Sequence, residues 1–382
     1  MQSDGRWALQ SEPYSCYFGG SAEYLSCFAQ TIGESELWAM HLALHPQANL
    51  LSVSRKRYAR LSTRDNKLCM DSNIPWGMDS LITLVYLDEK YSLKTCDNRF
   101  LSNDGKLVME HRPNTSFTLE LKSGKLAFKD CEGKFLSRTG PTGTLKSGRC
   151  SRPGKGELFD LEESHPQVSR QPTKDIMSLI PGVSISANQD DETDMETFQM
   201  EIDKETKKCM FRTNGGNYWT LVTHGGFLST ATEAANNGKY VCTKKNGQLA
   251  AVSDSLGEDE QFMLKLINRP ILVLRGENGF VCHHKTSNTL DCSRSVYDIF
   301  SLLFSDGAYQ IKSESYCYCF WFVSSSGLVC TDGNKPEDFF FEFVEYGRVA
   351  IKGQNSKYLR GDQGGTLMGD GLSVDASSLW EH

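Results

Sequence analysis

Residues 117–128, Phe-Thr-Leu-Glu-Leu-Lys-Ser-Gly-Lys-Leu-Ala-Phe, carry the pattern that decides the fold. Large apolar residues occupy alternate positions from Phe117 to Leu121, and the alternation resumes at Leu126 and Phe128 after a short turn sequence. Successive side chains of a strand point to opposite faces of a sheet. This period of two therefore predicts a β-hairpin with one buried face.

The same pattern recurs at residues 198–211, 300–311 and 339–351, each time around a short turn rich in Gly, Asp or Lys. No long stretch of the chain keeps the 3.6-residue period of an amphipathic helix. Several short hairpins separated by polar turns indicate an all-β protein.

An internal repeat organises these hairpins. A small-residue turn followed by an aromatic residue recurs at intervals near 40, with a weaker member expected at residues 183–185. The interval from Tyr218 to Tyr240 is only 22 residues. The aromatic markers are Phe18, Tyr58, Phe100, Phe135, Tyr218, Tyr240, Phe280, Phe320 and Tyr358.

Repeats of this length fit either propeller blades or threefold trefoils, because one four-stranded unit cannot bury its own apolar face. The Gly-His and Trp-Asp signature of WD-type blades is absent from the sequence, which counts against that kind of propeller.

Composition and charge narrow the functional classes. The chain has 382 residues and a net charge of −7, so nucleic acid is not expected as its main partner. The 13 cysteines and the lack of an apolar signal segment at the N-terminus favour free thiols in a reducing compartment. The apolar run at residues 316–323 is far shorter than the roughly 20 residues of a membrane helix. We expect a soluble intracellular protein that does not insert into membranes.

Long runs of the sequence resemble the fascins, and together they cover nearly the whole chain. One of them is Asn-Lys-Pro-Glu-Asp-Phe-Phe-Phe-Glu-Phe at residues 334–343, and another is Ala-Ser-Ser-Leu-Trp-Glu at residues 376–381. The remaining runs lie at residues 26–30, 75–84, 186–194, 243–249, 265–270 and 357–362.

The resemblance implies tandem β-trefoils of three units each. It implies a non-enzymatic cytoskeletal protein of the cytoplasm, without a cofactor, that acts as a monomer on F-actin and crosslinks parallel filaments into bundles. The divergent residues suggest a testis-type member of the family. The domains expected are a remnant of a first trefoil (1–46), a second trefoil (47–168), a third trefoil that lacks one hairpin (169–268) and a fourth (269–382).

Two departures from the family pattern accompany this division. The chain starts inside the first trefoil, so two units and the basic, serine-containing regulatory segment are expected to be missing. The short interval from Tyr218 to Tyr240 implies that a hairpin of roughly 18 residues is absent between two units, by the chain's own repeat. An incomplete trefoil exposes strand edges and apolar surface. We therefore expect the remnant and the third trefoil to be the least stable parts.

Local basic patches are the candidate contact sites, because actin filaments are acidic. Arg55, Lys56 and Arg57 form one such cluster, with Arg60 close by in the sequence. Two interpretations stay open for this cluster: a solvated hairpin tip, or a contact site for the filament.

Further candidates come from the resemblance. Lys244 and Lys245 match a basic loop that fascins use at a filament-binding surface, and Arg360 stands where the family carries a lysine implicated in actin contact. Arg275 and Glu277 match a loop near the cleft between the first and last trefoils, and Lys285 follows on the same hairpin.

Some positions weaken the match or suggest other chemistry. Tyr14-Ser15-Cys16 lies where fascins carry basic residues, and His284 replaces an expected arginine. The Cys317-Tyr-Cys319 sequence and the adjacent histidines at 283 and 284 are interpreted as buried thiols and turn histidines, because no second pair stands at metal-ligand spacing.

Three functions compete. The first is actin-filament bundling, which needs two filament-binding surfaces. The second is an actin-binding or scaffold module that has lost bundling along with the missing units. The third, a trefoil lectin, ranks last because the sequence has no repeated Gln-x-Trp sugar motif. No phosphate loop, dinucleotide fingerprint or nucleophile elbow supports an enzyme.

Overall fold

The computed structural model divides the chain into two compact units, and each is described by itself. Unit 1 comprises Met1–Pro75 and Asp79–Glu163, and unit 2 comprises Trp76–Met78 and Ser164–His382. The structure describes all residues except 1, 3–5, 22–23, 39–41, 43–44, 172–175, 180–184, 190–195, 204, 206–208, 222–226, 232–239, 245–248, 256–262, 314–318 and 346.

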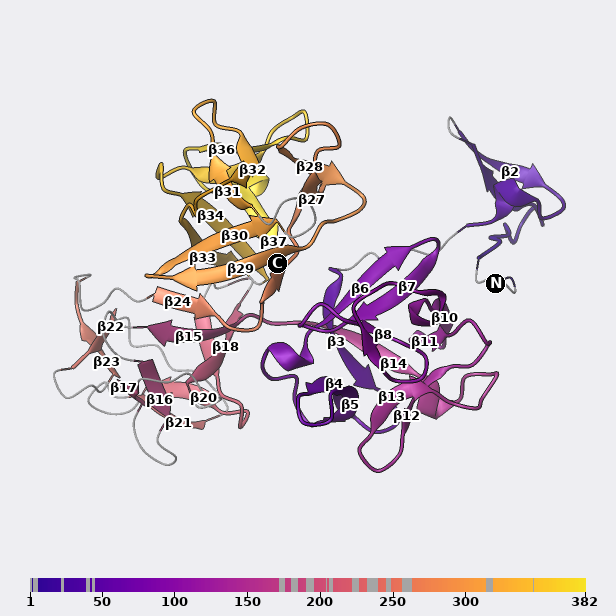
Figure 1. The fold of residues 1–382 in the computed structure, drawn as a ribbon, viewed down its shortest axis with the longest axis horizontal. Helices are drawn as coiled ribbons and strands as arrows, with labels where there is room; N and C mark the ends of the chain where they lie inside the picture. Colours follow the sequence, from indigo (N-terminus) through magenta and orange to yellow (C-terminus); the bar gives the residue numbers. More distant parts are fainter. Residues whose placement is uncertain are drawn as a thin grey trace. The chain divides into compact units, whose positions relative to one another are not determined.

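Unit 1 consists of strands and short 3₁₀ turns (Figure 1). A separate antiparallel hairpin, β1 (Tyr17–Gly20) and β2 (Leu25–Ala29), precedes the first 3₁₀ turn, η1 (Glu34–Glu36). The remaining elements are β3 (Gln47–Ser52), β4 (Arg57–Ser62), β5 (Lys67–Ser72), η2 (Met78–Ser80), β6 (Ile82–Leu87), β7 (Lys90–Lys94), β8 (Phe100–Leu101), β9 (Leu107–Val108), η3 (Pro113–Thr115), β10 (Thr118–Lys122), β11 (Lys125–Lys129), β12 (Leu136–Thr139), β13 (Thr144–Ser147), η4 (Lys155–Glu157) and β14 (Phe159–Glu163).

Strands β3 to β14 form one sheet of 12 strands, which we call the second block. Six of them pair in a closed ring in the order β3, β6, β7, β10, β11, β14 and back to β3, with β7 and β10 joined by the bridge between Tyr91 and Phe117. The other six form the hairpins β4–β5, β8–β9 and β12–β13. A six-stranded barrel with three hairpins is a β-trefoil, so the all-β prediction is confirmed.

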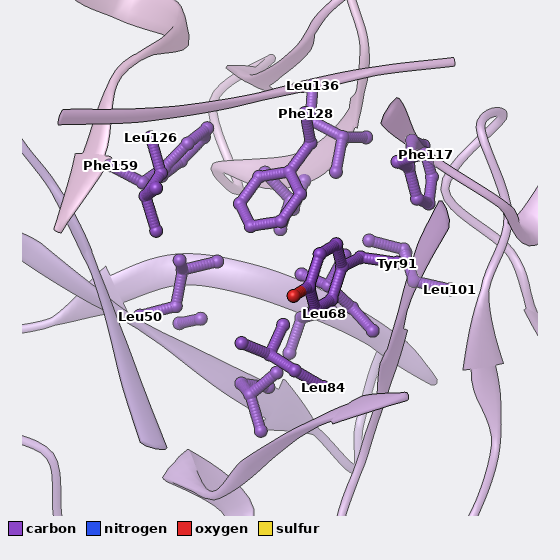
Figure 2. Packing of buried hydrophobic residues seen from close by; sticks show 14 of the residues in the cluster. Leu50, Leu68, Leu84, Tyr91, Leu101, Phe117, Leu126, Phe128, Leu136 and Phe159 are labelled. Atoms are coloured by element: carbon purple, nitrogen blue, oxygen red, sulfur yellow. The ribbon is translucent and has the colours of Figure 1, made fainter. Parts of the chain in front are cut away.

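The alternating residues at 117–128 form a hairpin whose apolar side chains enter the core of the second block, as the sequence predicts. β10 and β11 pair as a hairpin with Leu121 opposite Leu126, and Phe117 and Phe128 are completely buried. Figure 2 shows Phe128 in the middle of the cluster, and the Phe128 and Phe159 ring centroids are 6.1 Å apart. Leu121 is 38% exposed because it lies beside the turn, so the alternation overestimates burial there.

Unit 2 contains two further strand groups. The third block consists of β15 (Gln167–Gln171), β16 (Ile176–Leu179), β17 (Ile185–Gln189), β18 (Thr197–Ile202), β19 (Cys209–Arg212), β20 (Tyr218–Leu221), β21 (Phe227–Ala231), β22 (Tyr240–Thr243), β23 (Leu249–Ser253) and β24 (Met263–Leu266). The fourth block consists of β25 (Ile271–Leu272), β26 (Arg275–Gly276), β27 (Gly279–His283), β28 (Leu290–Arg294), β29 (Phe300–Ser305), β30 (Ala308–Ser313), β31 (Phe320–Val323), β32 (Val329–Gly333), β33 (Phe339–Glu345), β34 (Arg348–Gly353), β35 (Tyr358–Gly361), β36 (Leu367–Gly371), the 3₁₀ turn η6 (Ala376–Ser378) and β37 (Leu379–Glu381).

The fourth block is a complete trefoil. Its barrel runs through β25, β29, β30, β33, β34, β37 and β26, where β25 and β26 together supply the first strand. Its three hairpins contact one another in a cycle, because Thr289 bridges Cys330, Asp291 bridges Thr366 and Leu328 bridges Met368. The completely buried Trp321 packs edge-on against Phe300, with ring centroids 4.7 Å apart.

The third block is built differently. Its barrel strands in the part of the chain that the structure describes are β24, β15, β18 and β19, which pair in that order without closing a ring. Three hairpins, β16–β17, β20–β21 and β22–β23, are nevertheless present. The short interval between Tyr218 and Tyr240 falls between β20 and β22, at the position where the complete blocks have β10–β11 and β33–β34.

A β-bulge marks the first strand of most hairpins, and it corrects one sequence expectation. The register shifts directly after Tyr58, Tyr218 and Tyr240, and in the same way after Ile176 in β16. Of the weak repeat member expected at residues 183–185, residues 183 and 184 lie outside the described residues, and the register shift that marks this hairpin follows Ile176 instead. An isoleucine at this position escaped the search because the markers were sought as aromatic residues.

One buried guanidinium connects the two ends of unit 2. Arg269 is 2% exposed, and its Nη2 donates to the carbonyl oxygens of Ser164 at 2.7 Å and His382 at 3.3 Å. Its Nη1 donates to Ser164 Oγ at 3.2 Å. Hydrogen bonds to a charged donor are stronger than neutral ones. Arg269 therefore ties the segment before β15 to the residue after β37.

Cysteine and histidine chemistry differs from the sequence expectation at two positions. Cys319 takes part in a disulfide, so the expectation of free thiols is wrong there, although other described cysteines are free. His283 is a buried residue of β27 and not a turn residue, whereas His284 follows that strand. Cys317 lies outside the described residues. No helix in the described part of the chain is both long and apolar enough to span a membrane.

Hydrogen exchange should distinguish the open barrel from the closed one. Backbone amides in β18, β19 and β24 are expected to exchange faster than those in β29, β30 and β34, because an unclosed ring opens locally at lower free energy. Exchange followed by mass spectrometry on the intact chain measures this difference. Equal protection in the two sets of strands would contradict the expectation.

Candidate functional site

The basic cluster of unit 1 lies at the tip of the β3–β4 hairpin. Arg55 and Lys56 belong to the turn, Arg57 begins β4, and all three side chains are exposed. Lys56 adopts a left-handed conformation with φ of 52°, which turns the chain sharply at the tip. In the part of the chain that the structure describes, no carboxylate forms an ion pair with these three residues. The tip therefore presents uncompensated positive charge to solvent.

Arg275, in the fourth block, is half-buried and already engaged. Its guanidinium lies 3.7 Å from a carboxylate oxygen of Glu381 and stacks over the Phe280 ring at 5.5 Å from the centroid. Glu277 is exposed in the turn that follows. Arg275 thus contributes to the packing of the barrel end as well as to its charge.

Sequence reasoning missed Arg348, which shares the same carboxylate. Arg348 Nη2 lies 3.4 Å from Glu381 Oε1, so Glu381 is placed between two arginines that come from β26 and β34. The local charge of this trio is positive. The sequence alternation of β34 predicts that Arg348 and Val349 lie on opposite faces of the strand. It does not predict which residue pairs with Arg348.

Arg360 is less available than the resemblance implies. On the β35–β36 hairpin, its Nε lies 2.8 Å from Asp370 Oδ1 and its Nη2 donates to Asp370 Oδ2 at 3.0 Å. This two-point ion pair fixes the guanidinium and neutralises most of its charge. Any filament contact through Arg360 would have to compete with Asp370.

Two of the other candidates, Lys244 and Lys285, are exposed. Lys285 is exposed in the β27–β28 turn, and the five-residue strand β27 separates it from Glu277 by roughly 16 Å. Lys285 therefore lies at the opposite end of β27 from Arg275 and Glu277. Lys244 is exposed after β22, and Lys245 lies outside the described residues.

One constellation resembles a catalytic triad without being able to act as one. His283 Nδ1 lies 2.7 Å from Asp298 Oδ2, and His283 Nε2 lies 2.9 Å from Ser313 Oγ. A nucleophilic serine needs an approach path for its substrate. Ser313 is completely buried at the end of β30, so this network holds β27 and β30 together.

Comparison with known proteins identifies the family of this chain. The family model described as the fascin domain matches residues 48–161, 173–236 and 277–382. The chain belongs to the fascin family. The second match ends at residue 236, within the short interval from Tyr218 to Tyr240, and the third begins at residue 277 within the β26–β27 turn.

Individual fascins extend this result over the full chain. Fascin-2 of Bos taurus is 55% identical over 400 aligned residues, which cover 100% of this chain and 81% of that protein. Fascin of Strongylocentrotus purpuratus is 33% identical and covers 100% of this chain and 82% of that protein. Fascin-3 of Mus musculus is 27% identical and covers 99% of this chain and 80% of that protein.

The alignment with the Bos taurus protein is longer than this chain. About 18 of the 400 positions aligned with the Bos taurus protein carry no residue of this 382-residue chain. The expectation of a testis-type member stays a prediction, because none of these comparisons concerns a tissue.

Acid unfolding should report on the His283–Asp298 pair. Burial alone would raise the pKa of Asp298, but the hydrogen bonds from the His283 ring and backbone N–H outweigh it and lower that pKa below its ordinary value. A carboxyl group with a depressed folded-state pKa stabilises the fold above its unfolded pKa, and loses that stabilisation as the pH falls through the folded pKa.

The free energy of unfolding should therefore decline less steeply below about pH 4 in Asp298→Asn than in the unmodified chain. Denaturant titrations between acidic and neutral pH measure this slope. Asp306→Asn, in the exposed β29–β30 turn, is the control and should leave the slope unchanged. Identical slopes for Asp298→Asn and the unmodified chain would show that the pair does not contribute.

Proposed function

We propose that this chain binds actin filaments and crosslinks them into bundles in the cytoplasm, as a monomer of the cytoskeleton. The observation that carries the proposal is the match of the whole chain to fascins, at 55% and 33% identity in two distant animals. The proposed domains are the remnant at residues 1–46 and the trefoils at 47–168, 169–268 and 269–382.

Bundling needs at least two contact surfaces on one rigid body. The uncompensated tip formed by Arg55, Lys56 and Arg57 supports one surface in unit 1. The exposed Lys285 and Lys244 support contacts in unit 2, with Lys245, Arg275, Glu277 and Arg360 as further members of the proposed set. An acidic filament is attracted by such basic points even when the net charge of the chain is negative.

A second candidate function rests on the third block. Its four described barrel strands do not close a ring, and a surface built on that block would then lack the rigidity that a crosslinker requires. In this case the chain binds a filament through one surface only, or serves as a scaffold without bundling.

Sedimentation separates the two functions. If the chain bundles, actin filaments mixed with it should pellet at low speed, because bundles are much heavier than single filaments. Pelleting of the chain with actin only at high speed would favour single-surface binding. A variant with a strand pair of about 18 residues inserted between β21 and β22 serves as the comparison. Absence of the chain from both pellets would contradict both functions.

The tip of unit 1 should carry a salt-dependent part of the affinity. Replacement of Arg55, Lys56 and Arg57 by alanine is expected to weaken co-sedimentation with actin on the order of 10-fold at low salt, and less at high salt where charges are screened. Lys106→Ala is the control, because Lys106 is exposed in the same unit but pairs with Asp104 at 2.8 Å. Equal effects of the two substitutions would contradict a specific role for the tip.

A further inference from the structure

The loop between β13 and η4 carries a second cluster of exposed cations in the second block. Arg149, Arg152 and Lys155 are exposed, and none of them forms an ion pair in the part of the chain that the structure describes. Residues 47–163 hold 20 Lys and Arg against 15 Asp and Glu, although the net charge of the chain is −7. The second block is therefore a basic block in an acidic chain.

This loop lies beside the basic tip of the β3–β4 hairpin. Val53, at the start of that turn, donates its N–H to Leu158 O at 3.0 Å, so the end of the loop adjoins the tip. The Lys122 ammonium reaches the loop from the end of β10 and donates to Pro153 O. We call the exposed cations of the tip and the loop the basic face, which comprises Arg55, Lys56, Arg57, Arg149, Arg152 and Lys155.

One hydroxyl group stands in the middle of the loop. Arginine occurs two residues before a serine or threonine at only two places in the sequence, where Arg149 precedes Ser151 and Arg60 precedes Ser62. Protein kinases discriminate among substrates by the charges around the acceptor residue. By sequence alone, both serines are therefore candidate phosphoacceptors.

The structure distinguishes the two serines, because Ser62 is already engaged. Ser62 belongs to β4 and pairs with Lys67 of β5. Its Oγ donates to Asp65 Oδ2 and accepts from Asp65 N–H, both at 3.2 Å. A kinase needs the acceptor hydroxyl free to approach the γ-phosphate of ATP. Ser62 does not meet this requirement in the folded chain.

Ser151 does meet it. The residue is exposed, and residues 148–154 form neither a strand nor a 3₁₀ turn. Among the described backbone hydrogen bonds outside the strands, none involves residues 149–152. This stretch can therefore enter the active site of a kinase without breaking the barrel.

We propose that Ser151 is a phosphorylation site for a protein kinase that selects basic substrates. The Ser151 Oγ attacks the γ-phosphorus of ATP, and a new Oγ–P bond forms. At the same time the bond from the γ-phosphorus to the oxygen that it shares with the β-phosphate breaks, and ADP leaves. The hydroxyl proton passes to the catalytic aspartate of the kinase.

The phosphate acts on the basic face. A phosphoserine adds a charge of about −1.5 to −2 near pH 7 and three strong acceptor oxygens. Arg152 follows Ser151 directly and Arg149 stands two residues before it. Bonds between phosphate and guanidinium are strong and frequently bidentate. One modification therefore neutralises much of the positive charge that the face presents.

Phosphorylation of the intact chain tests the site. The catalytic subunit of the cyclic-AMP-dependent kinase and protein kinase C both select basic substrates, and each is incubated with the chain and Mg-ATP. We expect phosphate on Ser151, located by mass spectrometry of the digested chain, and none on Ser62. Arg149→Ala should lower the initial rate on the order of 10-fold, whereas its matched control Arg60→Ala should not change it. Absence of phosphate from Ser151 with both kinases would overturn the proposal.

Two synthetic peptides, residues 56–68 and 145–157, separate the effect of the fold from that of the sequence. Each peptide carries its serine with the arginine two residues before it. We expect both peptides to be phosphorylated, because neither holds its hydroxyl in a hairpin, whereas only Ser151 is modified in the intact chain. Equal modification of Ser62 and Ser151 in the intact chain would overturn the proposal.

Phosphorus-31 NMR of the phosphorylated chain tests the action on the basic face without actin. The second pKa of the phosphoserine should lie below its ordinary value of about 6, because neighbouring cations favour the dianion. Arg152→Ala should return this pKa toward the ordinary value. A pKa that is the same with and without Arg152, and equal to the ordinary value, would overturn the neutralisation of the face.

The consequence for filaments rests on the proposed actin binding. The phosphorylated chain should co-sediment with actin on the order of 10-fold more weakly than the unmodified chain at low salt, and the difference should shrink at high salt. Equal co-sedimentation of the two forms would overturn this consequence. Absence of both forms from the actin pellet would overturn the proposed function, whereas the phosphorylation site stands or falls by mass spectrometry alone.

Discussion

Closure of the strand ring is the constraint on which the rest of the structure depends. A single four-stranded repeat leaves one apolar face exposed and two sets of backbone groups unpaired. The face is buried and the backbone groups are paired only when three repeats come together. In the second and fourth blocks, the hairpins that join one repeat to the next close the barrel, while the remaining hairpins cover one end of it. The bridges at Tyr91 and Tyr309 are the points at which this closure is completed.

The same two tyrosines also connect each barrel to the chain segment that precedes it. Tyr91 OH accepts from Leu42 N–H at 2.7 Å, as Tyr309 OH accepts from Leu266 N–H. Each hydroxyl satisfies a backbone group that would otherwise be costly to bury. The internal repeat thus extends beyond the trefoils to the joints between them, and cysteine at the matching position 209 leaves the third block without such a hydroxyl.

The sequence alone predicts much of the fold, because period-two alternation and the recurrence of aromatic residues both arise from local geometry. The hairpins around residues 117–128 and 300–311 lie where the alternation predicts them. The marker at Ile176 was missed because its role comes from a bulge in the backbone and not from its side-chain type. A local pattern also cannot tell how deeply a residue beside a turn is buried, as Leu121 shows.

The candidate contact residues were less predictable, since ion pairs form between strands that are distant in the sequence. The exposed tip at Arg55 follows from its turn, but the neutralisation of Arg360 by Asp370 needs the register of β35 and β36. The Arg275–Glu381–Arg348 trio likewise joins Glu381 to residues that lie 106 and 33 positions before it in the chain. Such partners become visible only when the barrel closes.

The guanidinium of Arg269 has a mechanical consequence. It bonds to Ser164 at the start of unit 2 and to His382 at its end, so a pulling force applied between these two ends meets the Arg269 hydrogen bonds first. The intervening strands carry that load only after the clamp has broken. Together with Asn268, which bonds to His165 and Gln167, the Arg269 side chain holds the two ends of a segment that contains the third and fourth blocks.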